Sequence, residues 1–336
     1  DAEVGTLLGT TGGKAIICGG ESIALEEIFA AYENKLEEIY PMHTAAEEKK
    51  EIPTFTAKAE GIFYHAKAAV AKPRVLIPVF PGTNCEFDSA KAVERTGAEA
   101  NIFVINNLSA AGIADSIDRF AKEVKQAQTI FIPGGFSGGD EPEGSGKFIA
   151  TTFRNPAVAE AVTQLLNCRD GLMLGICNGF QALIKLGLVP YGKIIDTDET
   201  CPTLTFNNIS RHQSRIVRTR VASNKSPWLS LTNVGDVYNV PISHGEGKFL
   251  ASEELIRQLA ANGQIATQYV DLEGNPTADV HFNPNGSLYA IEGITSPDGR
   301  IFGKMGHSER IGSGLYKNVP GEYNIRMFEA AVKYFR

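Results

Sequence analysis

The sequence predicts an α/β fold, a doubly wound and mostly parallel sheet, with a β-hairpin-rich C-terminal part and a short N-terminal appendage. Two observations predict it. From Arg74 onward, short apolar runs alternate with helical segments, and these runs stay apolar at consecutive positions. Strands that are apolar on both faces are typical of parallel sheets covered on both sides. Right-handed crossovers between such strands then place helices on both faces of the sheet.

The first half of this region contains strands and helices in strict alternation. Glycine and proline turns separate the segments, and Gly97 closes the first helix. We expect strands over 75–80, 100–105, 129–132 and 172–176, and helices over 86–96, 114–126 and 157–166. The part over about 200–310 carries hairpin signals, with strands over 288–295 and 300–305 around the turn Ser296-Pro297-Asp298-Gly299. In doubly wound sheets the functional site lies at the carboxyl ends of the strands.

Residues 1–72 differ from the rest of the chain in their residue pattern. A Gly-rich start leads to a helical pattern over about 22–40, with Ser22 as its N-cap and Pro41 as its stop. The polar run 43–61 is typical of a linker. This region is too short for a core of its own. Because the chain does not begin with Met, we expect 1–72 to be the tail of an upstream domain plus a linker, and 73–336 to be the functional domain.

Composition excludes several classes of function. The 336 residues carry a formal net charge of −7, which argues against binding of nucleic acid through its phosphates. No apolar run reaches the ~20 residues that span a bilayer, and the start is not a signal peptide. The cysteines show neither Cys-x-x-Cys pairs nor zinc spacing, so we expect no metal site and a reducing, cytoplasmic location.

The sharpest local feature is the segment Gly175-Ile176-Cys177-Asn178-Gly179-Phe180-Gln181. An apolar strand ends at a cysteine between small residues, and a helix begins at once. This is the nucleophile-elbow arrangement of serine hydrolases with cysteine in place of serine. Flanking glycines allow the tight turn, and a helix N-terminus favours the reactive thiolate. The alternative is a buried structural cysteine in a Gly-rich turn. We predict that Cys177 is a nucleophile.

A nucleophile of this kind needs a base and a group that orients the base. His307 is expected at the end of a hairpin strand, and Glu309 would share its strand face and hold the imidazole. His43 and His65 lie outside the α/β region. His244 is an alternative base. However, the segment Gly245-Glu246-Gly247 beside it is more typical of a loop that approaches substrate closely than of a segment that carries the base. The pattern therefore favours a triad of Cys177, His307 and Glu309.

A second glycine-rich loop, Pro133 to Asp140, follows another apolar strand. Its carboxyl end is expected at the same edge as Cys177, so its backbone N–H groups, with that of Asn178, would form an oxyanion hole. The alternatives are a flexible loop and a phosphate-binding loop. The second lacks both the Walker Lys-Ser/Thr ending and a Gly-x-Gly-x-x-Gly opening onto a helix.

Together these residues resemble the triad-type, class I glutamine amidotransferases, which have a flavodoxin-like fold. More narrowly, the sequence over 74–336 is similar to the glutaminase domains of phosphoribosylformylglycinamidine synthases. The matching segments are FPGTNCEFD (80–88), IPGGFSGGDEPEGSGKFI (132–149), GLMLGICNGFQALIKLGLVP (171–190), RHQSRIVRTRV (211–221), PISHGEGKF (241–249), FNPNGSLYAIEGI (282–294) and MGHSER (305–310).

The resemblance implies roles for particular residues. Cys177, His307 and Glu309 would release ammonia from L-glutamine. The oxyanion and substrate-binding residues implied are Gly135, Phe136, Asn178, Gln181 and His244.

The resemblance also implies a partner. The long SGGDEPEGSGKFI string and the fused N-terminal stretch look like the single-polypeptide form of the enzyme. Residues 1–72 would then end an ATP- and magnesium-dependent synthetase portion that receives the ammonia, with no cofactor in the present chain.

Two alternatives remain. Another cysteine hydrolase on this fold would generally carry a histidine directly after the nucleophile, where this chain has Asn178. A non-catalytic regulatory module would show a broken triad, whereas all three positions are filled.

Overall fold

The computed structural model describes residues 8–10, 12–41, 51–61, 64–137 and 145–336. Contacts divide the chain into two compact units, Asp1–Glu48 and Lys49–Arg336.

The first unit is a small hairpin followed by a helix. Strands β1 (Ala15–Cys18) and β2 (Glu21–Ala24) pair antiparallel and lead into α1 (Leu25–Glu33) and the short 3-10 helix η2 (Asn34–Leu36). The helix expected from Ser22 was therefore wrong in its first turn. Gly19 and Gly20 both have positive φ, which suits a two-residue hairpin turn, and the pairing places Ser22 in β2.

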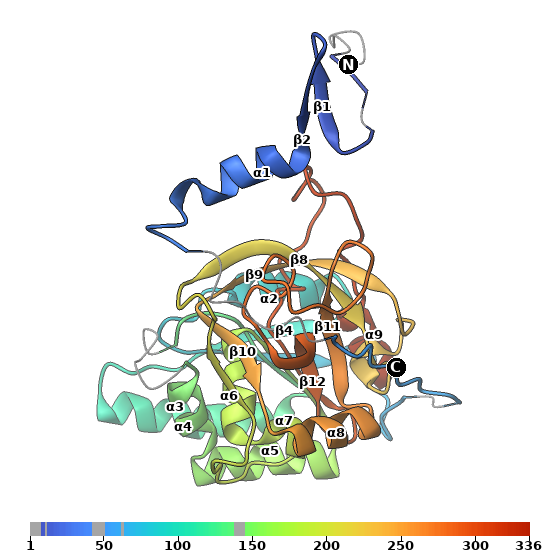
Figure 1. Cartoon of the computed structure of the whole chain (residues 1–336). Helices are drawn as coiled ribbons and strands as arrows, with labels where there is room; N and C mark the ends of the chain where they lie inside the picture. The colour runs from blue at the N-terminus through green and yellow to red at the C-terminus, as the bar shows by residue number, and fades with distance from the viewer. Residues whose placement is uncertain (1–7, 11, 42–50, 62–63, 138–144) are drawn as a thin grey trace. The chain divides into compact units, whose positions relative to one another are not determined.

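The second unit is built on a central sheet with helices packed against it (Figure 1). The sheet has nine strands in the order β4-β3-β5-β6-β13-β12-β11-β8-β9. The first five strands run parallel to their neighbours, and the pairs from β13 to β9 are antiparallel. The strands are β3 (Arg74–Val79), β4 (Glu99–Val104), β5 (Thr129–Ile132), β6 (Leu172–Ile176), β8 (Gln213–Val221), β9 (Val237–His244), β11 (Ile265–Val270), β12 (Ile291–Thr295) and β13 (Ile301–Lys304). A separate pair joins β7 (Thr203–Phe206) to β10 (Glu246–Leu250).

Helices cover both faces of this sheet. They are α2 (Glu86–Glu94), α3 (Ala110–Gln126), α4 (Lys147–Phe153), α5 (Pro156–Cys168), α6 (Asn178–Leu186), α7 (Leu188–Tyr191), α8 (Glu253–Asn262) and α9 (Met327–Phe335), with 3-10 turns η3 (Pro227–Leu229) and η4 (Leu288–Ala290). On one face α3 packs on α5 and α4 on α6. On the other, α2, η3 and α9 line one apolar crevice. The predicted doubly wound, mostly parallel sheet is confirmed.

Most of the predicted elements up to Ile176 are confirmed within a few residues. The expected C-terminal hairpin is present as β12 and β13, but residues 288–290 form η4 and not the start of a strand. Tyr289 has φ 53°, which a strand does not tolerate. Helices α4, α8 and α9 were not predicted.

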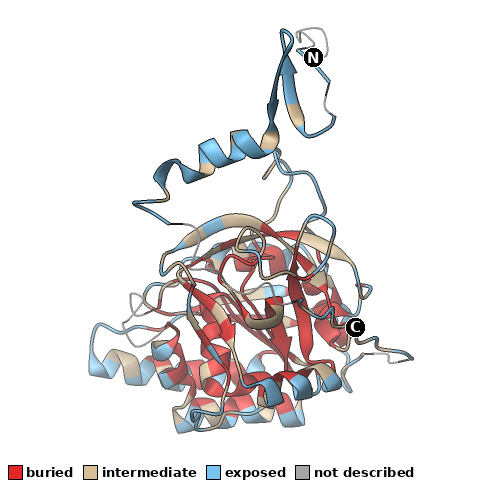
Figure 2. Ribbon diagram, viewed as in Figure 1, coloured by how far each residue is buried: buried red, intermediate tan, exposed pale blue. Residues whose placement is uncertain are grey.

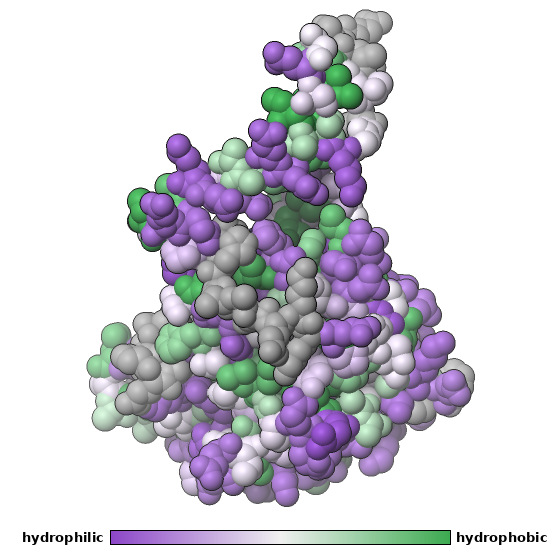
Figure 3. Space-filling view, in the orientation of Figure 1, coloured by the Kyte–Doolittle hydropathy of each residue, from purple (hydrophilic) through white to green (hydrophobic). Residues whose placement is uncertain are grey.

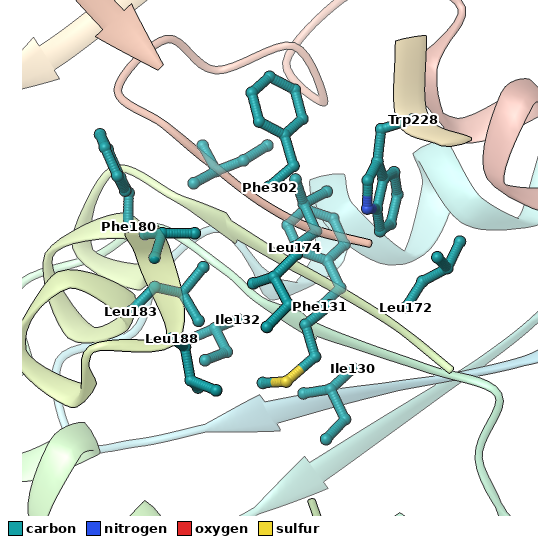
Figure 4. Packing of buried hydrophobic residues seen from close by; sticks show 14 of the residues in the cluster. Ile130, Phe131, Ile132, Leu172, Leu174, Phe180, Leu183, Leu188, Trp228 and Phe302 are labelled. Carbon is teal, nitrogen blue, oxygen red and sulfur yellow. The ribbon is translucent and has the colours of Figure 1, made fainter. Parts of the chain in front are cut away.

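The core lies between the sheet and its two helical layers (Figure 2). Figure 4 shows Phe180 and Leu183 of α6 on one side of the central strands and Trp228 on the other, with Leu174 between them. Phe131 of β5 packs on Phe328 of α9, with ring centroids 5.7 Å apart. Strands β5 and β6 are buried at every position, as their continuous apolar runs predicted.

Residues 51–72 are fastened to this unit where they are described. Ala66 and Val70 donate backbone hydrogen bonds of 2.7 Å to the carbonyls of Tyr334 and Phe335. Phe55 donates its N–H to the Gln268 side chain at 3.0 Å. These contacts agree with the division of the chain into two units, which assigns the described residues of 51–72 to the second unit.

Within the described part of the chain, no helix has both the length and the apolar composition that a membrane crossing requires.

Helix α6 lies directly against the sheet because Gly179 lacks a side chain. A Cβ atom at Gly179 would lie 2.0 Å from the carbonyl oxygen of Ile132 in β5, closer than any real contact. Either the helix or the strand would have to move to accommodate it. The glycine therefore sets how closely the first turn of α6 approaches β5.

We predict that Gly179→Ala lowers the free energy of unfolding by about 3 kcal/mol, since overpacking against backbone is poorly relieved. Gly245→Ala is the control, because a Cβ atom there meets nothing within 4 Å. It should change stability by less than about 1 kcal/mol. Urea unfolding measures both variants, and equal effects would contradict the close approach of α6.

Candidate active site

Four parallel strands end at one edge of the sheet and deliver the predicted site residues there. Strand β6 leads into Cys177, β5 into the loop from Pro133, β3 into the turn before Cys85, and β13 into the segment that carries His307. Carboxyl ends of parallel strands are the usual place for a site in such sheets. The structure therefore brings together residues that are far apart in the sequence.

Cys177 has the backbone conformation of a nucleophile elbow. Its φ of 53° and ψ of −107° lie where side chains other than glycine are strained. The N–H of Cys177 donates to the carbonyl of Lys304 at 2.9 Å, which ties the elbow to β13. A Cβ atom at Gly175 would lie 2.6 Å from the backbone of Gly179, so the turn requires both glycines. The thiol is buried and points to the carbonyl oxygen of Ser243 at 3.7 Å.

His307 and Glu309 form a buried hydrogen-bonded pair. The imidazole Nδ1 lies 2.6 Å from Oε1 of Glu309, and both side chains are at most 2% exposed. The expectation that they share a strand face was wrong, because β13 ends at Lys304 and the pair sits on the turn that follows. In that turn Arg310 donates its N–H to the carbonyl of His307 at 3.2 Å, which curls Glu309 back to the ring.

The charge of Glu309 controls the protonation of His307. Burial pushes the pKa of His307 down, but the Glu309 carboxylate, together with contacts to the Cys177 and Cys85 thiols, holds it well above its usual value. Glu309 occupies Nδ1, and Nε2 has no hydrogen-bond partner among the described residues. Nε2 is thus the nitrogen available to exchange a proton with Cys177.

Cys85 lies on the other side of the same imidazole. Its Sγ is 3.9 Å from Nδ1 of His307 and 3.1 Å from Oδ1 of Asn84. Ligand atoms of Cys85, His307 and Glu309 all lie within 4.8 Å of one another. However, the Nδ1–Glu309 hydrogen bond engages the nitrogen that a metal at this position would need. The cluster therefore fits a hydrogen-bonded triad with a neighbouring thiol better than a metal site.

His244 lies near the same centre but in a different chemical state. Burial first, and then the charges of His307 and His212, lower the pKa of His244 to about 3. Its Nδ1 is 3.2 Å from Oδ1 of Asn207, whose Nδ2 donates to the carbonyls of Arg211 and His244. Because that amide oxygen accepts, Nδ1 carries the proton and Nε2 is a bare acceptor. His244 is therefore neutral, whereas His307 has a carboxylate partner that stabilises its protonated form.

The glycine-rich loop packs on the turn after β3. Gly135 has φ 154°, and its Cβ would lie 2.6 Å from the Gly82 carbonyl oxygen. Phe136 donates its N–H to that oxygen at 2.8 Å. The N–H of Phe136 is therefore engaged within the protein, and Phe136 lines the pocket, where it was expected. Residues 138–140 of the predicted loop lie outside the described residues.

Asn178 and Gln181 connect the elbow to its surroundings through side-chain hydrogen bonds. Asn178 accepts from the N–H of Ser137 at 3.2 Å and donates to Oε1 of Gln181 at 2.9 Å. Gln181 donates to the carbonyl of Glu246 at 2.6 Å. The N–H of Asn178 lies in the first turn of α6, where a helix offers no acceptor of its own. It is the backbone donor closest in sequence to the nucleophile.

A small pocket of about 190 Å³ opens at Cys177. Its lining residues are Gly135, Phe136, Ser145, Cys177, Gln181, Ser243, His244, Gly245 and Glu246.

Two of these lining residues, Ser145 and Ser243, were not singled out from the sequence, whereas Glu246 was expected as part of the loop Gly245-Glu246-Gly247 that approaches substrate. The buried Glu246 carboxylate accepts the N–H of Ser145 at 2.9 Å. The signal for Glu246 was its place between two glycines after a strand.

The fold is that of the class I glutamine amidotransferases. Residues 72–335 match the family model described as "CobB/CobQ-like glutamine amidotransferase domain". The chain belongs to this family.

Named relatives support the same assignment. The phosphoribosylformylglycinamidine synthase subunit PurQ of Methanococcus maripaludis is 35% identical over 284 residues, covering 78% of this chain and 97% of the relative. The subunit of that name from Dehalococcoides mccartyi is 34% identical over 274 residues, covering 80% and 99%. A solved structure, PurLQS from Thermotoga maritima, superposes with a TM-score of 0.57 at 26% identity, covering 79% of this chain and 100% of that one.

The low pKa of His244 makes stability depend on pH. The unfolded chain binds a proton at this residue below about pH 6.5, whereas the folded chain does so only near pH 3. Stability from this group is therefore complete above pH 6.5 and is lost as the pH falls toward 3. From about pH 8 to about pH 5, the protein should lose about 2 kcal/mol more than its His244→Gln variant. Urea titrations of both proteins measure this, and equal losses would contradict a neutral, buried His244.

Proposed function

We propose that this chain is the glutaminase of a phosphoribosylformylglycinamidine synthase and hydrolyses glutamine to glutamate and ammonia through Cys177, His307 and Glu309. The observation that carries the proposal is the joint geometry of the strained, buried Cys177 and the 2.6 Å His307–Glu309 pair. The family model supports glutamine as the substrate, and the named relatives, which are subunits of that synthase, support the synthase as the enzyme that this glutaminase serves.

The reaction begins when Cys177 transfers its proton to Nε2 of His307. The thiolate attacks the side-chain carbonyl of glutamine, and the tetrahedral intermediate collapses when the imidazolium protonates the departing nitrogen. Ammonia leaves and a γ-glutamyl thioester remains. His307 then takes a proton from water, which attacks the thioester and releases glutamate and the Cys177 thiolate. The raised pKa of His307 favours the imidazolium that these reaction steps require.

Backbone and side-chain groups around the pocket bind the substrate. The N–H groups of Gly135 and Asn178 stabilise the oxyanion, each donor being worth ~10²–10³-fold in rate. The Glu246 carboxylate attracts the α-ammonium group of glutamine, because it is the acidic side chain among the lining residues. Gln181 and the bare Nε2 of His244 add polar contacts that a hydrocarbon side chain would not satisfy.

The ammonia is consumed by a synthetase portion that uses ATP and magnesium, which we place upstream in the same polypeptide. The support comes from the first unit. None of its described residues is buried, while Ile17, Tyr32 and Ile39 are at least 70% exposed. Figure 3 shows hydrophobic residues interspersed with hydrophilic ones in this unit. A hairpin and helix without a core of their own need apolar partners from further sequence. The named relatives are separate subunits, so the fusion is the finer part of the proposal.

Cys177→Ala should abolish release of glutamate from glutamine, because it removes the thiol that forms the thioester. Cys168→Ala is the matched control: this cysteine is exposed at the end of α5 and should leave turnover unchanged. A coupled glutamate assay measures both. Normal turnover by Cys177→Ala would show that the nucleophile is misassigned.

Glu309→Ala should lower kcat roughly 10²–10⁴-fold without abolishing turnover, since His307 loses the carboxylate that orients it and stabilises its charge. The KM for glutamine should change little, because Glu309 is not among the residues that line the pocket. Steady-state kinetics with glutamine separate the two constants. An unchanged kcat would remove Glu309 from the triad.

Attachment of the upstream synthetase portion should slow backbone hydrogen exchange in α1 at least about tenfold, because docking protects amides that are now exposed. Exchange in α5, which is already packed, should stay the same. Mass spectrometry of peptides from both proteins compares them. Equal exchange in α1 would contradict docking of the first unit onto a synthetase.

A further inference from the structure

A buried ion pair contacts the two residues on either side of His307. Lys304, the last residue of β13, has its Nζ 3.2 Å from Oε1 of Glu292 on the neighbouring strand β12. The two side chains are 1% and 0% exposed. Neither lines the pocket, and the reaction above uses neither.

The pair holds both residues that flank His307. The N–H of Gly306 donates to Oε1 of Glu292 at 2.6 Å. Nζ of Lys304 donates to the carbonyl of Gly306 at 3.0 Å and to Oγ of Ser308 at 3.1 Å. The three donors of the ammonium group are therefore directed at Glu292 and at the two neighbours of the histidine.

The glycine makes this arrangement possible. A Cβ atom at Gly306 would lie 3.0 Å from Oε1 of Glu292 and 2.6 Å from the side chain of Val240. Glycine is also the residue with the most backbone freedom, so a histidine that follows it is poorly fixed unless other groups hold the segment. Thr267 donates its hydroxyl to the second carboxylate oxygen and keeps Glu292 in place.

Stability alone is a weak reason for such a pair. Well-packed hydrophobic residues in place of a buried ion pair are often as stable or more so. A displacement of about 1 Å at a catalytic group, by contrast, can cost about 10²-fold in rate. The contacts of this pair converge on the two residues whose backbone sets the position of the imidazole.

We propose that Lys304 and Glu292 are positioning residues, which hold the Gly306–Ser308 segment so that Nε2 of His307 faces Cys177. The proposal rests on the proposed function for its kinetic readout. The reactivity of the Cys177 thiol, which depends on the position of His307, can also be measured without glutamine.

The test is the double variant Glu292→Gln with Lys304→Met, which removes both charges and keeps an amide that accepts from Thr267. Its kcat for glutamine should fall about 10–100-fold with a nearly unchanged KM. Leu165→Ala in α5 is the control for stability, since it opens a buried cavity away from the triad. It should lower the Tm and leave kcat unchanged at a temperature where both variants are folded.

Alkylation of Cys177 by iodoacetamide separates this proposal from the proposed function. A misplaced imidazole takes up the thiol proton less well, so the double variant should react more slowly than the unsubstituted protein. A protein that alkylates rapidly but ignores glutamine would overturn the proposed function and leave the positioning role intact. A folded double variant with normal alkylation and normal kcat would overturn the positioning role.

Ser308→Ala keeps the question answerable if the double variant does not fold. It removes one contact of Lys304 and no charge. Its kcat should fall about 2–10-fold with the KM retained, which is the value of one hydrogen bond. A normal kcat and alkylation rate in Ser308→Ala would overturn the proposal in that case.

Discussion

The positive φ of Cys177 is the constraint on which the rest of the site depends. A side chain other than glycine in such a conformation costs of order 1–3 kcal/mol and persists only where the surroundings enforce it. Here they do so from three directions. Gly179 lies against β5, Gly175 lies against Gly179, and β13 accepts the N–H of Cys177. Eight of the nine residues of α6 are buried, so the helix cannot move to relieve the strain.

The two buried histidines near the thiol of Cys177 differ in charge. The Glu309 carboxylate stabilises the protonated form of His307. His244 is hydrogen-bonded to an amide and stays neutral because of its burial. After burial, the charge of His307 also lowers the pKa of His244, and the two imidazoles differ in protonation. In the proposed mechanism His307 exchanges protons, and His244 offers an acceptor to the pocket. Since the Glu309 carboxylate is the largest of the causes that raise the pKa of His307, the turn that presents Glu309 matters as much as the residue itself.

The sequence predicted those parts of the fold whose pattern is local. Continuous apolar runs marked β5 and β6, and the glycine-flanked Cys177 marked the elbow. Phe136 could not be judged in this way, because its N–H bonds a carbonyl from the turn after β3, some 50 residues earlier. The hairpin before α1 was missed although Gly19-Gly20 signals a turn, since the helical pattern from Ile23 onward was the stronger signal. The pairing of Lys304 with Glu292 depends on strand register, which the residue types alone do not specify.

The central claim is that Cys177 is the nucleophile and that glutamine is its substrate. The most direct measurement is peptide-mapped labelling with a diazo-ketone analogue of glutamine, with and without competing glutamine. A single adduct on Cys177 that glutamine prevents is the predicted result. Exposed thiols such as Cys18 and Cys168 should stay unlabelled, because they lack the elbow and the pocket. An adduct on another cysteine, or labelling of Cys177 that glutamine does not slow, would contradict the account.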